Sequence, residues 1–213
     1  MRRIAAVLIG AACLVGLAIP AGAAPPEDEK SAVVNVYWTI REKTGDRTFR
    51  QTTWYVGAYV SSEYGASSDG YQDVSNCVFL DRRHYRCRQE SFKIGYSNLD
   101  RPGEYFTIDA QNLDYATLGG LYPLQSYDDN GFPTGPIEWT VITADITGKG
   151  ELRSSTDTYT HRDGDCRYRT TTSTLERGFV AGGTVNGMEL PPTTDGFMNY
   201  SESRTSSIGC GGY

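Results

Sequence analysis

The segment Val34-Asn-Val-Tyr-Trp-Thr-Ile-Arg41 decides the fold. Every second side chain from Val34 is apolar, and the positions between carry polar or amphipathic side chains. Successive side chains of a β-strand point to opposite faces, so this alternation predicts a strand with one buried and one wet face. The run Thr52–Ser61 repeats the pattern, and the segment 137–141 repeats it again.

The same alternation sorts the aromatic residues into two groups. The tryptophans share a face with Val, Ile or Ala, so we expect them in the core rather than on a sugar-binding surface. Several tyrosines fall on the opposite faces, where neighbouring strands would bring them into a wet platform; ordinary cross-strand packing is the alternative. The expected core residues are Trp38, Trp54 and Trp139, and the platform residues are Tyr37, Tyr55 and Tyr59.

Turn signals support an all-β class. Asp163-Gly164, flanked by Arg162 and Asp165, predicts a two-residue hairpin between strands 154–161 and 166–174, with the two flanking charges facing each other. Asn186-Gly187 predicts a second hairpin of this type, and Pro191-Pro192 is expected to end the strand that follows. No helical periodicity extends beyond about two turns after the leader.

The first 31 residues have the features of an export leader and a linker. Two arginines precede an apolar run over residues 4–19, and Ala21-Gly-Ala23 provides a small-residue cleavage site. This order predicts a signal peptide over 1–23 and a secreted protein with no transmembrane segment in the mature chain. An uncleaved anchor, twin-arginine export and lipidation at Cys13 are the alternatives. Residues 24–31 form a charged, Pro-rich linker.

Removing Cys13 leaves four cysteines, an even number that predicts disulfides in an exported protein. Three connectivities are possible, and Cys77–Cys87 with Cys166–Cys210 places one bridge in each half of the chain. We expect two small antiparallel β-sandwich halves, Ig-like in size, over 32–112 and 113–213. A single continuous sandwich is the alternative.

Composition narrows the functional classes. Hydrophobic residues make up 38% and aromatic residues 12% of the 213-residue chain, which excludes a disordered protein. The net charge of −6 argues against a general nucleic-acid binder. No cofactor motif is present, and zinc is disfavoured because there is no Cys-x-x-Cys pair and only two histidines.

One pattern extends over most of the mature chain. The run Leu113-Asp-Tyr-Ala-Thr-Leu-Gly-Gly-Leu-Tyr-Pro-Leu leads to the Trp139 strand, and Gly164-Asp-Cys166-Arg-Tyr-Arg and Val180-Ala-Gly-Gly-Thr-Val-Asn-Gly187 follow before Cys210. This sequence pattern resembles that of a loosely defined group of secreted actinobacterial β-sandwich proteins without assigned activity. The resemblance implies secretion and an all-β fold, and it carries over no functional residues.

Motifs for catalysis are weak. Only His84 and His161 are available as bases, and no Gly-x-Ser-x-Gly elbow occurs. Glu138 is the first carboxylate to inspect for glycoside hydrolysis, although an outward strand residue is the better interpretation. The segment 126–137 has alternating oxygen side chains, but Ile137 stands where a calcium loop requires Glu, so a turn is the better interpretation.

A basic loop stands out in this acidic chain. Cys77 and Cys87 enclose nine residues, and four arginines gather in and after them: Arg82, Arg83, Arg86 and Arg88. A stapled loop loses less entropy on binding, so it suits an anionic polymer or a protein partner, or a protease that accepts Arg82 or Arg83. A solvated hairpin tip is the alternative.

Together these observations predict a secreted, non-catalytic protein that binds a polysaccharide, a cell wall or a protein. The expected contacts are the arginine loop and the tyrosine platform. A protease inhibitor that uses the 77–87 loop and a small hydrolase with unidentified carboxylates are the alternatives.

Overall fold

The computed structural model describes residues 28–63, 65–98, 106–128 and 130–210. Its fold is all-β and antiparallel, as the alternation predicts, and none of the described residues forms a helix long and apolar enough to cross a membrane. The predicted signal peptide lies outside the described residues. The strands are β1 (Asp28–Lys43), β2 (Thr48–Ser61), β3 (Gly65–Phe79), β4 (Tyr85–Asn98), β5 (Phe106–Ile108), β6 (Tyr115–Tyr127), β7 (Pro133–Asp163), β8 (Cys166–Val185), β9 (Met188–Thr193) and β10 (Gly196–Cys210).

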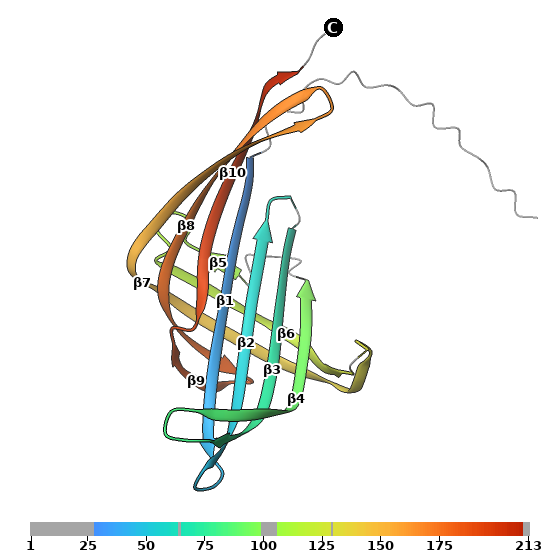
Figure 1. The fold of residues 1–213 in the computed structure, drawn as a ribbon, viewed down its shortest axis with the longest axis vertical. Coiled ribbons are helices and arrows are strands. Elements are labelled where there is room, and N and C mark those ends of the chain that lie inside the picture. The colour runs from blue at the N-terminus through green and yellow to red at the C-terminus, as the bar shows by residue number, and fades with distance from the viewer. Residues whose placement is uncertain (1–27, 64, 99–105, 129, 211–213) are drawn as a thin grey trace, which may run out of the picture.

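All ten strands belong to one sheet, and that sheet closes on itself. The order runs β10-β1-β2-β3-β4-β6-β7-β8-β9, and β10 pairs with β8 as well as with β1. In Figure 1, β1–β4 form the front of the molecule and β6 and β7 cross behind them. The two expected halves, 32–112 and 113–213, therefore share one continuous sheet, because the first strand pairs with the last.

Strand pairing also extends into the expected linker. Residues 28–31 belong to β1, and Asp28 lies opposite Arg204 of β10. The two side chains form a two-point ion pair, with distances of 3.0 and 3.2 Å from the guanidinium nitrogens to the carboxylate oxygens. This pairing explains why a polar, charged segment is ordered as strand.

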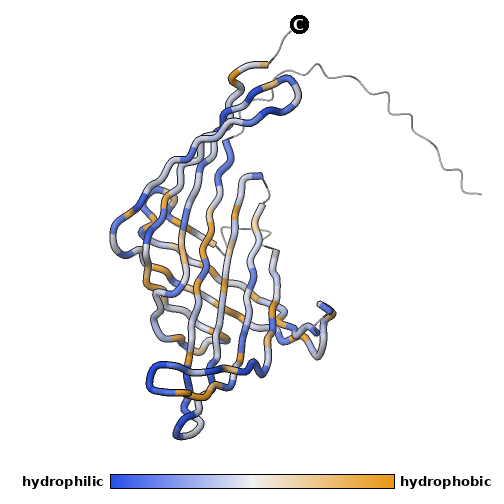
Figure 2. Tube along the Cα trace, in the orientation of Figure 1, coloured by the Kyte–Doolittle hydropathy of each residue, from blue (hydrophilic) through white to orange (hydrophobic). Residues whose placement is uncertain are grey.

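The core fills the inside of the closed sheet. Trp38 and Trp54 are buried there, as their alternation predicts, together with Val34, Val36 and Val56. Trp38 is fully enclosed and is one of the largest side chains in this packed core. Figure 2 shows that apolar residues concentrate in this closed body.

A short chain of hydrogen bonds crosses the core. Ser68 of β3 donates its only hydroxyl proton to the carbonyl oxygen of Gly57, at 2.6 Å. The hydroxyl of Tyr122, on β6, lies 2.6 Å from the Ser68 oxygen and must therefore donate to it. Both side chains are buried, and the Tyr122 hydroxyl depends on Ser68 for its hydrogen bond, whereas Ser68 also bonds the Gly57 carbonyl.

Trp139 was expected in the core, and that expectation is wrong. Its side chain is 63% exposed, whereas Ile142, Ala144 and Ile146 of the same strand are buried. Between residues 137 and 146, apolar residues occupy both odd and even positions. Three alternating apolar residues were therefore not enough to predict which face of the strand is buried. The even-numbered series, Ile142, Ala144 and Ile146, is the one that faces the core.

The hairpins differ in how well they were predicted. Asn186-Gly187 forms the expected turn, with Val185 paired to Met188 and positive φ angles of 50° and 79° at the two turn residues. The other turn is Gly164-Asp165, one residue later than expected, because Asp163 pairs with Cys166. Arg162 consequently faces Arg167 instead of Asp165.

The strand β9 continues through its two prolines to Thr193, so Pro191-Pro192 does not end it. The pairing with β8 shifts register between Ala181 and Gly183, which accommodates residues that cannot donate a backbone hydrogen bond.

Part of the β7–β8 hairpin projects beyond the closed body together with the end of β10 (Figure 1). We call residues 153–176 of the β7–β8 hairpin and the paired residues 199–210 of β10 the arm; at its base, residues 199–204 also pair with β1 in the closed sheet. The arm is mostly hydrophilic (Figure 2). The expected Cys166–Cys210 disulfide joins β8 to β10 near its tip.

Candidate binding surface on the outer face

Three tyrosines form a row across the outer face of β1, β2 and β3. Tyr37 lies opposite Tyr55, and Tyr55 lies opposite Tyr71. The ring centroids of Tyr37 and Tyr55 are 4.9 Å apart, and those of Tyr55 and Tyr71 are 4.7 Å apart in a stacked arrangement. Phe92 of β4 extends the row, with its centroid 5.4 Å from that of Tyr71. We call Tyr37, Tyr55 and Tyr71 the tyrosine row.

The predicted platform is therefore partly present. Tyr37 and Tyr55 come together as expected, whereas Tyr59 lies opposite Val33 and Ser67 and makes no ring contact with the row. Sequence reasoning missed Tyr71, because polar residues fill both faces of β3 and leave no hydrophobic alternation. Its place follows only from the β2–β3 register, in which Ser61 pairs with Gly65 and Tyr55 with Tyr71.

The rings cover one another's faces, so the row presents edges and hydroxyl groups to solvent. Tyr55 is only 8% exposed, because Tyr37 and Tyr71 flank it on the two neighbouring strands. The hydroxyl groups of Tyr37 and Tyr71 are not hydrogen-bonded to any described residue. They remain available as donors and acceptors for a ligand.

The Tyr55 hydroxyl is held by residues of the two neighbouring strands, β1 and β3. The hydroxyl donates to Oδ1 of Asn35 at 3.0 Å, and Oδ1 of Asp69 lies 3.4 Å away. Asn35, Gly57 and Asp69 form the next row of the sheet. A Cβ atom at Gly57 would collide with the Tyr55 hydroxyl, so only glycine leaves room for this ring to lie along the strand.

The electrostatics of the row are set by burial and by carboxylates. Burial raises the pKa of Tyr71 to about 12 and raises the pKa of Tyr55 further, with the charge of Asp69 acting in the same direction. Burial also raises the pKa of the Asp69 carboxyl, although its hydrogen bond from Tyr55 opposes that shift. The tyrosines therefore stay neutral donors at physiological pH.

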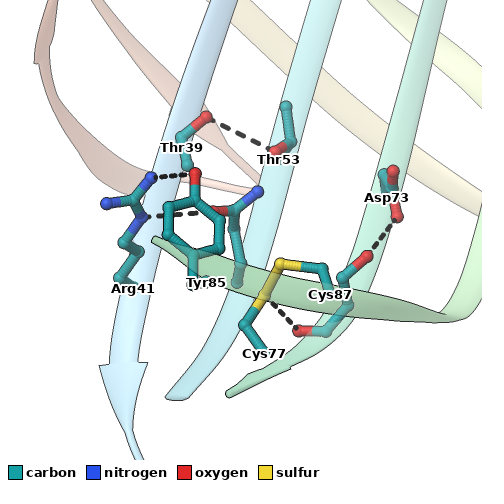
Figure 3. The surroundings of a disulfide bond; sticks show 9 residues. Thr39, Arg41, Thr53, Asp73, Cys77, Tyr85 and Cys87 are labelled. Carbon is teal, nitrogen blue, oxygen red and sulfur yellow. Dashed lines mark hydrogen bonds between the residues drawn. A yellow bond between two sulfur atoms is a disulfide. The ribbon is translucent and has the colours of Figure 1, made fainter. Parts of the chain in front are cut away.

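The predicted Cys77–Cys87 disulfide is present and closes the β3–β4 hairpin (Figure 3). Oδ1 of Asp81 accepts hydrogen bonds from the backbone N–H groups of Arg83 and His84, at 2.7 and 2.8 Å. These bonds lower the pKa of Asp81, the bond from Arg83 having the largest effect. The tip at residues 80–84 is thus a defined turn rather than an open loop.

The four predicted arginines are exposed on this hairpin: Arg82, Arg83, Arg86 and Arg88. None of their side chains has a hydrogen bond or ion pair with a residue that the structure describes. Arg86 and Arg88 line a hollow of about 380 Å³ together with Thr48 and Phe49 of β2. Arg82 and Arg83 occupy the tip.

The hairpin bends back over the outer face of the sheet. Its pairing shifts register between Val74 and Ser75, which bends the strands. Beyond this bulge, the Tyr85 ring packs edge-on against Phe49 of β2 with centroids 5.4 Å apart. Nη2 of Arg41, on β1, donates to the Tyr85 hydroxyl at 2.9 Å.

The bend brings the two predicted patches together. Arg41, Thr39 and Tyr37 follow one another along the outer face of β1, so the hairpin contact at Arg41 lies four residues, or about 13 Å of strand, from the tyrosine row. Thr39 and Thr53 lie between the hairpin and the row, with Asp73 on the next strand (Figure 3). The row, these polar residues and the hairpin form one continuous surface.

The other residues singled out in the sequence do not form a site with one another. His84 bonds the Asp81 carboxylate at 2.7 Å, and His161 stacks on Tyr168 in the arm. Glu138 pairs with Lys93. In segment 126–137, Asp128 accepts hydrogen bonds from backbone N–H groups, as expected of a turn. No group of three or more metal-ligating side chains occurs among the described residues.

Comparisons with known proteins give little guidance. No family model and no curated protein matches the chain. Among solved structures, the enduracididine biosynthesis enzyme MppR, complexed with the condensation product of pyruvate and imidazole 4-carboxaldehyde, aligns over 95% of both chains at 8% identity, with a TM-score of 0.24. A likeness of this size carries no argument about fold or activity.

Proposed function

We propose that this protein is a non-catalytic binding protein that acts outside the cell and holds a polysaccharide on the outer face of β1–β3, beside the stapled hairpin. The continuity of the tyrosine row with the hairpin is the observation that supports this proposal most directly. The two disulfides are compatible with an extracellular site of action.

The chemistry of the surface suits a hydroxyl-rich ligand. Free tyrosine hydroxyls both donate and accept, and the carboxylates of Asp69 and Asp73 accept. Arg41 donates at the border with the hairpin. Because carboxylates lie in the centre and arginines at the rim, a neutral sugar chain fits this surface better than a uniformly charged polymer.

Co-sedimentation of the processed chain with insoluble polysaccharides and purified cell walls tests the proposal. We expect saturable pelleting that changes little with salt, because hydrogen bonds and ring contacts dominate. The double variant Tyr37→Phe/Tyr71→Phe keeps both rings and removes both free hydroxyls, so it should weaken binding by about tenfold. Tyr115→Phe is the matched control, since Tyr115 is exposed on the outer face of β6.

Two results would count against this surface. Pelleting that is equal for the double variant and the wild type would remove the tyrosine row from the site. Pelleting that disappears in high salt, and on Arg82→Gln/Arg83→Gln substitution, would move the binding to the hairpin. No pelleting on any surface would refute the polysaccharide proposal itself.

A protease inhibitor is the second candidate, supported by the rigid, exposed turn that carries Arg82 and Arg83. It has weaker support, because the backbone N–H of Leu80 bonds the carbonyl of His84 and closes the tip into a tight turn. Proteases bind an extended segment, which adds a strand to their own edge. Loss of inhibition of an arginine-specific protease on Arg82→Ala/Arg83→Ala substitution would favour this candidate.

A further inference from the structure

The tip of the arm places two arginines directly opposite each other. Arg162 of β7 pairs with Arg167 of β8, one position from the pair Asp163–Cys166 that closes the turn. The closing pair of a two-residue hairpin is hydrogen-bonded, so the next pair is of the non-hydrogen-bonded kind, in which side chains approach most closely. Like charges at such a position destabilise a sheet.

A third arginine joins them on the same face. Arg169 lies two residues beyond Arg167 and pairs with Thr160. Because alternate residues of a strand share a face, all three side chains project from one side of the arm. We call Arg162, Arg167 and Arg169 the arginine trio. All three are exposed.

The trio lacks the neutralising partners found elsewhere on this face. Arg204 of β10 occupies the same face two rows away, and Asp28 holds its guanidinium in a two-point ion pair. The trio forms no ion pair with any residue of the described ranges, although Asp163 and Asp165 adjoin it in sequence. Three positive charges thus stand together uncompensated in a chain of net charge −6.

The scaffold keeps the trio together and open. The Cys166–Cys210 disulfide fixes β8 against β10 beside Arg167, and Gly164, with a φ of 56°, makes the tight turn possible. Gly209 lies opposite Arg167 on β10, and a Cβ placed there would meet no atom within 4 Å. No β10 side chain therefore lies opposite Arg167.

We propose that the arginine trio is a binding site for a phosphate group. Guanidinium groups match the geometry of phosphate oxygens through two parallel hydrogen bonds, and a dianion removes the repulsion between Arg162 and Arg167. The phosphate is either a free ion or an ester on a polymer. This site lies on the arm, shares no residue with the tyrosine row and does not depend on the proposed polysaccharide binding.

Thermal unfolding of the full, oxidised protein in phosphate and in chloride of equal ionic strength is the first test. Because a ligand that binds only the folded state raises its stability, we expect a higher Tm in phosphate. Arg162→Gln should abolish that increment, yet its Tm in chloride should equal or exceed that of the wild type, since the like-charge pair is gone. That second readout shows that the variant is folded.

Arg153→Gln is the matched control, because Arg153 is an exposed arginine at the base of the same arm, opposite Glu176. This variant should keep the full increase in Tm that phosphate gives the wild type. Titration with inorganic phosphate and with short-chain polyphosphate then separates the sources of the anion. A response to both indicates a single phosphate group, and a response to polyphosphate alone indicates a polymer.

Affinity for the responding probe should fall by about tenfold or more in Arg162→Gln and in Arg167→Gln, because each removes a charged hydrogen-bonding partner. The proposal is overturned if phosphate and chloride give the same Tm and polyphosphate does not bind. It is also overturned if Arg153→Gln weakens binding as much as Arg162→Gln, because the effect would then reflect net charge alone.

Discussion

The hydrogen-bond chain in the core allows a quantitative test of how the closed sheet is stabilised. Tyr122→Phe removes one hydroxyl but leaves Ser68 bonded to the Gly57 carbonyl, so we expect a loss of about 1 kcal/mol in the free energy of unfolding. Ser68→Ala leaves the buried Tyr122 hydroxyl without its acceptor, and this should cost about 2–3 kcal/mol.

The double variant should lose no more than Ser68→Ala alone, because it removes both members of the pair and leaves no stranded hydroxyl. The coupling between the two sites is then at least about 1 kcal/mol. Urea unfolding of the oxidised protein, followed by tryptophan fluorescence and far-UV circular dichroism, measures all four free energies. Additive losses, or a larger loss in Tyr122→Phe than in Ser68→Ala, would refute the donor order assigned here.

Three further predictions concern packing and pH. Gly57→Ala should destabilise the protein by about 1–3 kcal/mol, and adding Tyr55→Phe should recover part of that loss, because the added methyl group collides with the Tyr55 hydroxyl; urea unfolding that shows no recovery would contradict this. Trp139→Ala should change the free energy of unfolding by less than about 0.5 kcal/mol, against about 3–5 kcal/mol for Trp38→Ala, and only Trp139 should be quenched readily by iodide. Burial raises the pKa of Tyr122 from its ordinary value near 10 to about 12, so its contribution is fully present below pH 10 and is lost as the pH rises through 12. Tyr122→Phe should therefore flatten the alkaline decline in stability, and equal slopes for the two proteins would argue against this assignment.

Local pattern predicted the strands well, because a strand with one wet face leaves a period of two in the sequence. β1 alternates as predicted from Ala32 to Trp38, whereas residues 54–58 of β2 are all buried, since neighbouring rings cover Tyr55 on the outer face. Asn186-Gly187 forms the turn that its positive φ angles require. Pairing between strands that are far apart in the sequence leaves no such pattern. Nothing in the alternation of β1 shows that its second neighbour is β10, so the two expected halves could not be recognised as one sheet.

The candidate surface was predicted in parts for the same reason. Tyr37 and Tyr55 were identified from their own strands, whereas Tyr71 needed the register of β3. The contact between Arg41 and Tyr85 depends on a bulge in the hairpin, which the sequence does not signal. A one-residue difference in the β7–β8 turn had the largest effect, since it replaced an expected Arg162–Asp165 attraction with the Arg162–Arg167 pair.

Closure of the sheet has a consequence for how the chain folds. The seam between β1 and β10 joins residues as far apart as Asp28 and Arg204, which are separated by 176 positions. Contacts of such long range form slowly, because the intervening chain must be confined before they contribute. Until the seam forms, β1 carries an unpaired edge that can recruit a strand from another molecule. This topology therefore predicts slow folding that is completed when β10 docks on β1.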